Sequence, residues 1–224
     1  MGDIVYCWGW NGFGQLGDGT HIQRLVPTRP AGWDHFSKVS AGNYHSCGVT
    51  LSGKGFCWGM NSYWQIGNNA PTQRDQLRPG AIVGGLTFTD VQAGYFHTCG
   101  VTTGHRAYCW GHNGPELGSP AGSNDDYQRT PKLVAGGLAF RAVDGGYYNT
   151  CGVTTSNVAY CWGTFVIDGT VTERWRPLRV TNALWFRQVS ASWNNTGGSC
   201  GVTLDERAFC WGRGGTPTQL PGPD

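Results

Sequence analysis

The sequence predicts an all-β fold built from tandem repeats, and three observations support this prediction. Glycine supplies 37 of the 224 residues, more than twice its usual share of about 7%. Charged residues make up only 13%, about half of the ~25% in an average globular protein, which argues against a helical fold. Three short motifs also recur in a fixed order, and the length suits one all-β domain with a sizeable core.

The repeat unit is defined by three motifs that recur every 46 to 52 residues. Cys-Trp-Gly occurs five times, around Trp8, Trp58, Trp110, Trp162 and Trp211. Cys-Gly-Val-Thr occurs four times, starting at Cys47, Cys99, Cys151 and Cys200. Phe-x-x-Val occurs four times, starting at Phe36, Phe88, Phe140 and Phe186.

Each motif is typical of a short strand. Residues 36–39 place apolar side chains as a half-buried strand does, and residues 46–50 and 55–59 are rich in Val, Phe, Trp and Thr. Three or four strands in about 50 residues predict a β-propeller with four nearly complete blades and one half blade. This arrangement is either a partial ring or a ring that a partner completes.

The hairpin turn between the second and third strands is expected to need a left-handed residue. Gly53 supplies it in the first full unit, and Asn157 can supply it in the third. His105 and Glu206 fit this conformation less well, so we expect their turns to differ. The chain is treated as one repeat domain over 1–224, divided into a half repeat 1–38, repeats 39–90, 91–142 and 143–188, and a terminal repeat 189–224.

Eight cysteines pair by position, ten residues apart, across the predicted hairpins. The expected disulfides are Cys47–Cys57, Cys99–Cys109, Cys151–Cys161 and Cys200–Cys210. Hairpin register places each pair at a non-hydrogen-bonded position, close enough for a disulfide. Four such bridges indicate an extracellular, periplasmic or cell-surface protein. Buried free thiols remain an alternative, and the spacing disfavours zinc.

Cys7 has no partner cysteine in this scheme. It belongs to a Cys-Trp-Gly motif without a preceding Cys-Gly-Val-Thr strand, so the chain is expected to begin within a blade. Either additional sequence or another chain would supply the missing strands, because proteins normally cover open sheet edges.

The motifs resemble a known family. The sequence Ala-Gly-Asn-Tyr-His-Ser-Cys-Gly-Val-Thr at 41–50, Cys-Trp-Gly-x-Asn, and Gly-Gln-Leu-Gly-Asp-Gly-Thr at 14–20 are similar to regulator-of-chromosome-condensation repeats. The resemblance is strongest to the bacterial extracellular branch with paired cysteines, which includes a secreted inhibitor of β-lactamases. It implies a β-propeller that binds a partner through aromatic loop residues. The Gly-Gln-Leu-Gly element weakens at 64–67 and 116–118 and is then lost.

Aromatic residues recur at loop positions that successive blades would place on one rim, a composition typical of protein-binding hot spots. The candidate partner-binding residues are Tyr44, His45, Tyr95, Phe96, His97, Tyr147, Tyr148, Trp193, Trp10, Met60 and His112. His45 and His97 also have a structural interpretation, because Asn149 and Asn195 replace them in later units. The tryptophans of Cys-Trp-Gly are expected to pack in the core.

The function predicted from sequence is that of a non-enzymatic, exported protein-interaction module. No catalytic or phosphate-binding motif is present, and we expect no cofactor, no metal site and no catalytic residue. The net charge of +2 disfavours nucleic acid, and no apolar run is long enough for a membrane helix. The alternatives are a structural subunit of a larger envelope complex and a carbohydrate-binding propeller that recognises glycans.

Overall fold

The computed structural model describes residues 3–32, 35–120, 126–167, 170–191, 198–212 and 216–221. Most strands in these ranges form four antiparallel four-stranded sheets, here named blades 1 to 4. Blade 1 contains β5 (Lys38–Ala41), β6 (His45–Val49), β7 (Gly55–Gly59) and β8 (Gln76–Ala81). Blade 2 contains β9 (Phe88–Ala93), β10 (His97–Thr102), β11 (Ala107–His112) and β12 (Tyr127–Leu133).

The C-terminal half of the chain repeats this pattern. Blade 3 contains β13 (Phe140–Gly145), β14 (Asn149–Thr154), β15 (Ala159–Ile167) and β16 (Thr170–Arg179). Blade 4 contains β17 (Phe186–Ser190), β18 (Ser199–Thr203), β19 (Ala208–Trp211) and β20 (Thr218–Gln219). A short 3₁₀ helix, η1 (Pro115–Leu117), lies between β11 and β12. The predicted all-β propeller architecture is confirmed.

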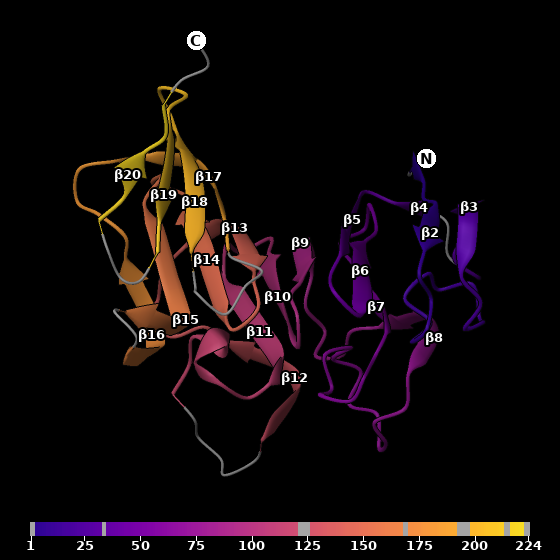
Figure 1. The fold of residues 1–224 in the computed structure, drawn as a ribbon. Coiled ribbons are helices and arrows are strands. Elements are labelled where there is room, and N and C mark those ends of the chain that lie inside the picture. The colour runs from indigo at the N-terminus through magenta and orange to yellow at the C-terminus, as the bar shows by residue number, and fades with distance from the viewer. Residues whose placement is uncertain are drawn as a thin grey trace.

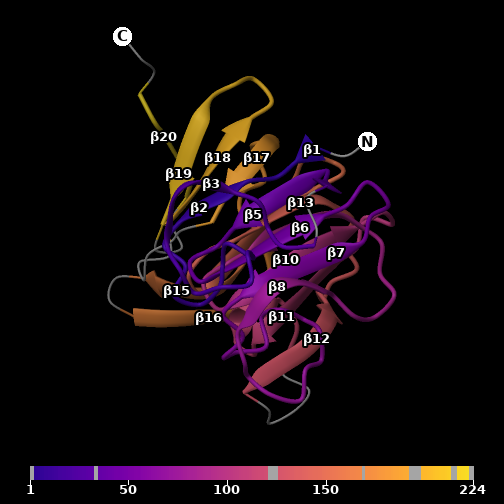
Figure 2. The same ribbon diagram turned by 90° about the vertical axis from the view of Figure 1, so that its right-hand side faces the viewer.

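Two smaller sheets precede blade 1. The pair β2 (Cys7–Gly9) and β3 (Arg24–Thr28) is the predicted half blade. The pair β1 (Asp3–Ile4) and β4 (His35–Phe36) joins this half blade to the beginning of blade 1. Figures 1 and 2 show the sheets following one another in chain order, with the indigo half blade and the yellow blade 4 at opposite sides in Figure 1.

The predicted hairpin register is confirmed in all four blades. Each cysteine pair is directly opposite across the second and third strands, and four disulfides form, with Cα–Cα separations of 4.0–4.1 Å. Among the described cysteines Cys7 is free. These bridges are typical of proteins in an oxidising environment.

The expectation that two hairpin turns would differ is wrong. Gly53, His105, Asn157 and Glu206 all have left-handed backbones, with φ of 78°, 59°, 63° and 66°. The same hydrogen bond closes each turn, for example from Gly53 N–H to the Thr50 carbonyl and from His105 N–H to the Thr102 carbonyl, both at 2.9 Å. The backbone pattern of the repeat therefore overrides the ordinary preference of these side chains.

Neighbouring blades share a core. Cys47 and Val49 of blade 1 pack with Phe88 and Val91 of blade 2, beside the fully buried Trp110. The same arrangement recurs between blades 2 and 3 and between blades 3 and 4. The disulfides of blades 1 to 3 are thus buried between two sheets, and each repeat needs its neighbour to cover its apolar face.

The tryptophans of three Cys-Trp-Gly motifs connect their blades to the preceding repeat. Trp58 donates from Nε1 to the Gln15 carbonyl at 2.9 Å, and Trp110 donates likewise to Gln65 at 2.9 Å. Trp162 donates to the Glu116 carbonyl at 2.8 Å. The core role predicted for the motif's tryptophans is confirmed for these three, which are completely buried, whereas for Trp8 it is wrong, because that side chain is 61% exposed. The weakened Gly-Gln-Leu-Gly elements therefore keep the geometry of the first one.

Blade 3 departs from the other blades. Its third strand continues past Gly163 and pairs with β16 as far as Thr170, where other units have a loop. Arg174, Arg176 and Arg179 therefore lie in a strand. Arg174 lies over the ring of Phe165, with 5.1 Å from Cζ to the ring centroid. This long hairpin occupies the place that the Gly-Gln-Leu-Gly element has in the earlier units, which explains why the third unit lacks that element.

Candidate protein-interaction surface

The predicted aromatic positions lie at one end of the blades. In an antiparallel sheet, the connection after the first strand and the connection after the third strand emerge at the same end. Residues 42–44, 94–96 and 146–148 form the first kind of connection. Trp10, Met60 and residues that follow β11 belong to the second kind, so the topology brings both sets together.

The aromatic rings of three blades contact one another continuously. The ring centroids of Tyr44 and Tyr95 are 5.2 Å apart, and their hydroxyl oxygens are 3.1 Å apart. Tyr95 contacts Tyr147 at 4.0 Å, and Tyr147 contacts Tyr148 at 4.4 Å. Phe96 lies beside Tyr95, with centroids 4.2 Å apart. Such offset and edge-on pairs stabilise one another beyond simple burial.

Further rings extend this surface at both sides. Phe13 links Trp10 to Tyr44, with centroid distances of 5.4 and 5.3 Å. Tyr63 contacts Phe96 at 4.3 Å and Tyr127 at 5.8 Å. We define the aromatic surface as the partly or fully exposed rings of Trp10, Phe13, Tyr44, Tyr63, Tyr95, Phe96, His112, Tyr127, Tyr147 and Tyr148.

Three members of this surface were missed by the sequence analysis: Phe13, Tyr63 and Tyr127. Phe13 and Tyr63 are 50 residues apart and each stands two positions before a glutamine. Their backbone N–H groups donate to Gln15 Oε1 and Gln65 Oε1, at 3.0 and 2.9 Å. The repeat period could have identified this pair, whereas Tyr127 has no such signal.

The phenols of Tyr95 and Tyr148 in this surface are uncharged at neutral pH. The hydrogen bond with Tyr44 is the main cause that raises the pKa of Tyr95 above its usual value. Burial raises the pKa of Tyr148 to about 12. The hydroxyl groups therefore act as neutral hydrogen-bond donors and acceptors on an apolar base, a combination that suits a protein interface.

Three predicted partner-binding residues lie beneath the surface. His45 and His97 are fully buried, and their Nε2 atoms lie 2.8 and 2.9 Å from the hydroxyls of Thr98 and Thr150 in the next blade. Burial lowers the pKa of His45 to about 3 and that of His97 to about 4. Met60 is also buried. These residues support the surface from below, in agreement with the structural interpretation of the two histidines.

His112 lies at the edge of the surface. Its Nδ1 is 2.5 Å from Glu116 Oε1, and this hydrogen bond raises the pKa of His112. Its ring is 6.0 Å from that of Tyr148. Trp193, the candidate of the fourth unit, is outside the described residues, as is Asn195.

No feature of the described residues indicates a metal centre, because they hold no cluster of three or more His, Cys, Asp or Glu side chains suited to an ion. Among these same residues, no helix has the length and apolar character required to cross a bilayer.

Disulfide-bridged, four-stranded blades in a regular arc with an aromatic end define a propeller-type repeat protein. Residues 3–49 match one model of the regulator of chromosome condensation (RCC1) repeat, and residues 36–65 and 88–114 match a second. Residues 3–65 and 88–114 of the chain therefore consist of RCC1 repeats.

Known proteins agree with this assignment. The chain is 30% identical over 168 residues to the ultraviolet-B receptor UVR8 of Arabidopsis thaliana, covering 72% of this chain and 37% of the receptor. Human WBSCR16 has a similar fold, with a TM-score of 0.82, 16% identity and coverage of 99% of this chain and 63% of that one. Prp20p of Saccharomyces cerevisiae, described with its binding to Gsp1p and histones, matches with a TM-score of 0.75, 20% identity and coverage of 90% and 52%. The chain thus spans little more than a third of the length of UVR8.

Proposed function

We propose that this chain is a non-enzymatic protein-interaction module that is exported to an oxidising compartment and binds one protein partner through the aromatic surface. The observation that carries the proposal is the uninterrupted series of ring contacts from Trp10 to Tyr148, across the half blade and blades 1 to 3. Aromatic side chains that are already fixed by their neighbours lose little entropy on binding, which favours affinity.

A protein partner suits this surface better than a glycan. A lectin of this architecture would repeat one pocket with the same polar neighbours in every blade. Here the rings of successive blades contact one another, as Tyr44, Tyr95 and Tyr147 do, and form a single surface. The relative Prp20p binds the proteins Gsp1p and histones, which is consistent with a protein-binding role for the same fold.

Export is supported by the disulfides. All eight cysteines of the complete blades are paired. The six in blades 1 to 3 are buried, whereas Cys200 and Cys210 of blade 4 are more accessible. Paired cysteines in every repeat are typical of secreted, periplasmic or cell-surface proteins and unusual in a reducing cytosol.

A matched pair of tryptophan variants tests the proposal. Trp10 of the aromatic surface and Trp185 at the opposite end are each 52% exposed. The oxidised protein and the variants Trp10→Ala and Trp185→Ala serve as baits for an extracellular extract. Each captured protein is then purified and titrated against all three baits.

We expect the Trp10→Ala bait to bind its purified partner at least about tenfold more weakly than the parent, whereas the Trp185→Ala bait binds like the parent. Equal binding by Trp10→Ala and the parent would refute the assignment of the surface. Loss of binding after enzymatic deglycosylation of the partner would instead identify a lectin.

A further inference from the structure

The outer edge of β2 has no neighbouring strand among the described residues. There β2 pairs only with β3, whereas the equivalent strands of the four blades have neighbours on both sides. In blade 1, a backbone hydrogen bond joins Thr50 and Lys54 at the hairpin turn. Hydrogen-bonded and non-hydrogen-bonded pairs alternate from there along the two strands, so Ser46 and Trp58 form a pair that exchanges backbone hydrogen bonds. Trp8, the equivalent of Trp58, thus directs its backbone N–H and carbonyl toward the open edge.

Side chains around this edge are exposed although their equivalents in later repeats are buried. Trp8 is 61% exposed, against 0% for Trp58. Val39 is 49% exposed, against 2% for Val91. In blade 1 the second strand covers Val91 with Cys47 and Val49, so the strand missing from the half blade is the one that would cover Val39.

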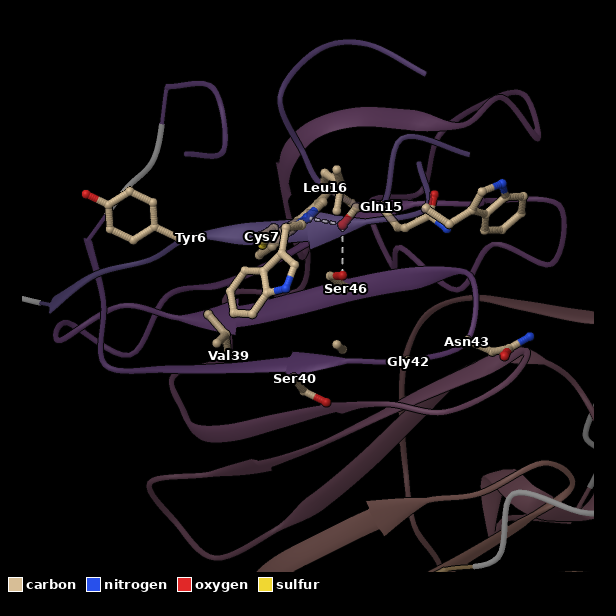
Figure 3. Close-up of a pocket in the computed structure, with 13 residues that line it drawn as sticks. Tyr6, Cys7, Gln15, Leu16, Val39, Ser40, Gly42, Asn43 and Ser46 are labelled. Carbon is tan, nitrogen blue, oxygen red and sulfur yellow. Dashed lines mark hydrogen bonds between the residues drawn. The ribbon is translucent and has the colours of Figure 1, made fainter. Parts of the chain in front are cut away.

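A cavity of about 440 Å³ occupies the position of that strand. It is lined by β2, by the Gln15 region and by the start of blade 1, as Figure 3 shows for Cys7, Val39 and Ser46. The cavity continues the interface that joins each blade to the next. Its walls therefore have the shape and spacing that the second strand of a repeat fits elsewhere in the molecule.

Ser46 offers a specific hydrogen-bonding position in this cavity. Its hydroxyl donates to the Gln15 carbonyl at 2.9 Å. The equivalent Thr98 donates likewise to Gln65 at 2.7 Å and also contacts the Nε2 of His45, two residues before Cys47. Thr150 repeats this pattern with His97, two residues before Cys99. For Ser46, the described residues show only the bond to Gln15.

We propose that the open edge of β2 binds an antiparallel strand of the repeat's own type, in which a His or Asn two residues before a cysteine contacts Ser46 and the cysteine forms a disulfide with Cys7. In this register, the cysteine lies opposite Cys7 as Cys47 lies opposite Cys57. The valine that follows two positions after this cysteine in the incoming strand then covers Val39, as Val49 covers Val91. This surface is separate from the aromatic surface, and it takes a strand whether or not the aromatic surface binds a protein.

The covalent step requires a disulfide on the incoming strand. The Cys7 thiolate attacks the sulfur of the strand's cysteine, which is in a mixed disulfide with a second thiol. A new S–S bond to Cys7 forms, the old S–S bond breaks, and the second sulfur leaves as a thiolate with the electron pair. Burial raises the pKa of the Cys7 thiol to about 11. Unassisted reaction with small disulfides at neutral pH is therefore slow, and a bound strand gains its advantage by holding the two sulfurs together.

The probe is a synthetic peptide with the sequence of residues 44–50, Tyr-His-Ser-Cys-Gly-Val-Thr, whose cysteine carries a thiopyridyl leaving group. Release of thiopyridone from the oxidised 224-residue chain reports the rate. We expect the peptide to react at least about tenfold faster than a scrambled peptide of the same composition, with saturation at high concentration. Replacing the peptide histidine with alanine should slow the reaction about two- to tenfold.

Two protein variants complete the test. Cys7→Ser should abolish the reaction, which assigns it to this thiol. Val39→Lys, at an exposed position that tolerates change, should slow the ordered peptide while leaving the rate with dithiodipyridine unchanged. Equal rates for the ordered and scrambled peptides would overturn the proposal, and so would conversion of the chain to a Cys7–Cys7 dimer in place of the peptide adduct.

Discussion

At the residue scale, one glycine in each of the first three units permits the close approach of the next blade. Gly17, Gly67 and Gly118 have φ of 73°, 73° and 65°, and each lies against the indole of the following Cys-Trp-Gly motif. A Cβ on Gly67 would lie 2.4 Å from Trp110 Nε1, an approach that no adjustment of the rigid, buried indole can easily relieve. The last residue of the Gly-Gln-Leu-Gly element must therefore be glycine for two reasons: its φ is positive, and a Cβ would collide with the indole.

The variant Gly67→Ala should lower the free energy of unfolding by about 2–4 kcal/mol, because it combines left-handed strain with overpacking. Gly85→Ala is a matched control, since Gly85 has φ of 67° and a Cβ added there would meet no atom within 4 Å. This control should cost only the backbone strain, about 1–2 kcal/mol. Urea denaturation of the two variants measures the difference, and equal losses would show that the indole contact is unimportant.

The buried histidines predict an acid sensitivity. The pKa of His97 is lowered to about 4 by burial, below the ordinary value of about 6.5 in the unfolded chain. Between these values the unfolded state binds one more proton, so stability is complete above pH 6.5 and decreases as the pH falls. From pH 7 to pH 5 the loss is about 2 kcal/mol for each such histidine.

Asparagine replaces this histidine in the third unit, where Asn149 donates to Ser199 at 3.2 Å, so His97→Asn is a conservative test. Its unfolding free energy should change between pH 7 and pH 5 by about 2 kcal/mol less than that of the parent. The double variant with His45→Asn should lose about twice as much pH dependence. Parallel pH profiles for parent and double variant would contradict the burial of neutral imidazoles.

At the element scale, the hairpin with its disulfide is the unit that repeats without change. Closing a loop of about ten residues stabilises the chain by ~2–3 kcal/mol in the chain-entropy model. Replacing both Cys99 and Cys109 with alanine should therefore lower the unfolding free energy by at least that amount, since their sulfurs also pack in the core of blades 2 and 3. Cys7→Ser is the control and should cost clearly less. A similar loss for both variants in urea titrations would argue against a stabilising role of the bridge.

The elements were the most predictable part of this molecule. Motif periodicity and hairpin register gave the strands, the four disulfides and the solitary Cys7, because each depends on local spacing. The left-handed His105 and Glu206 were not anticipated, since their conformation is imposed by hydrogen bonds with flanking strands. The continuation of β15 into β16 was also missed, because the change from loop to long hairpin follows no repeated motif.

The candidate surface was predicted only in part. The rim positions of Tyr44, Tyr95 and Tyr147 follow from the repeat, and they do meet. His45 and Met60 are also adjacent to loops in sequence, but His45 lies in β6, which directs its side chain into the interior, and Met60, just after β7, is buried as well. Contacts between repeats, such as Tyr63 with Phe96, depend on how blades are stacked and are not visible within one unit.

At the scale of the whole molecule, the chain is an arc of blades (Figure 1). It has two distinct surfaces. One end presents the aromatic rings, and the open edge of β2 presents the cavity beside Cys7. The disulfide bridges hold the second and third strands of each blade in register, and the half blade shows what is exposed when that partner strand is lacking, as for Trp8.

Counting free thiols tests this account most directly. The 224-residue chain is produced by export to an oxidising compartment, denatured without reductant, alkylated and weighed by mass spectrometry, with peptide mapping to locate the label. The account predicts one alkyl group per chain, on Cys7, and nine after reduction. Labelling of the cysteines of the four blades without reductant would contradict the disulfide-bridged structure and, with it, the proposal that the protein functions outside the reducing cytosol.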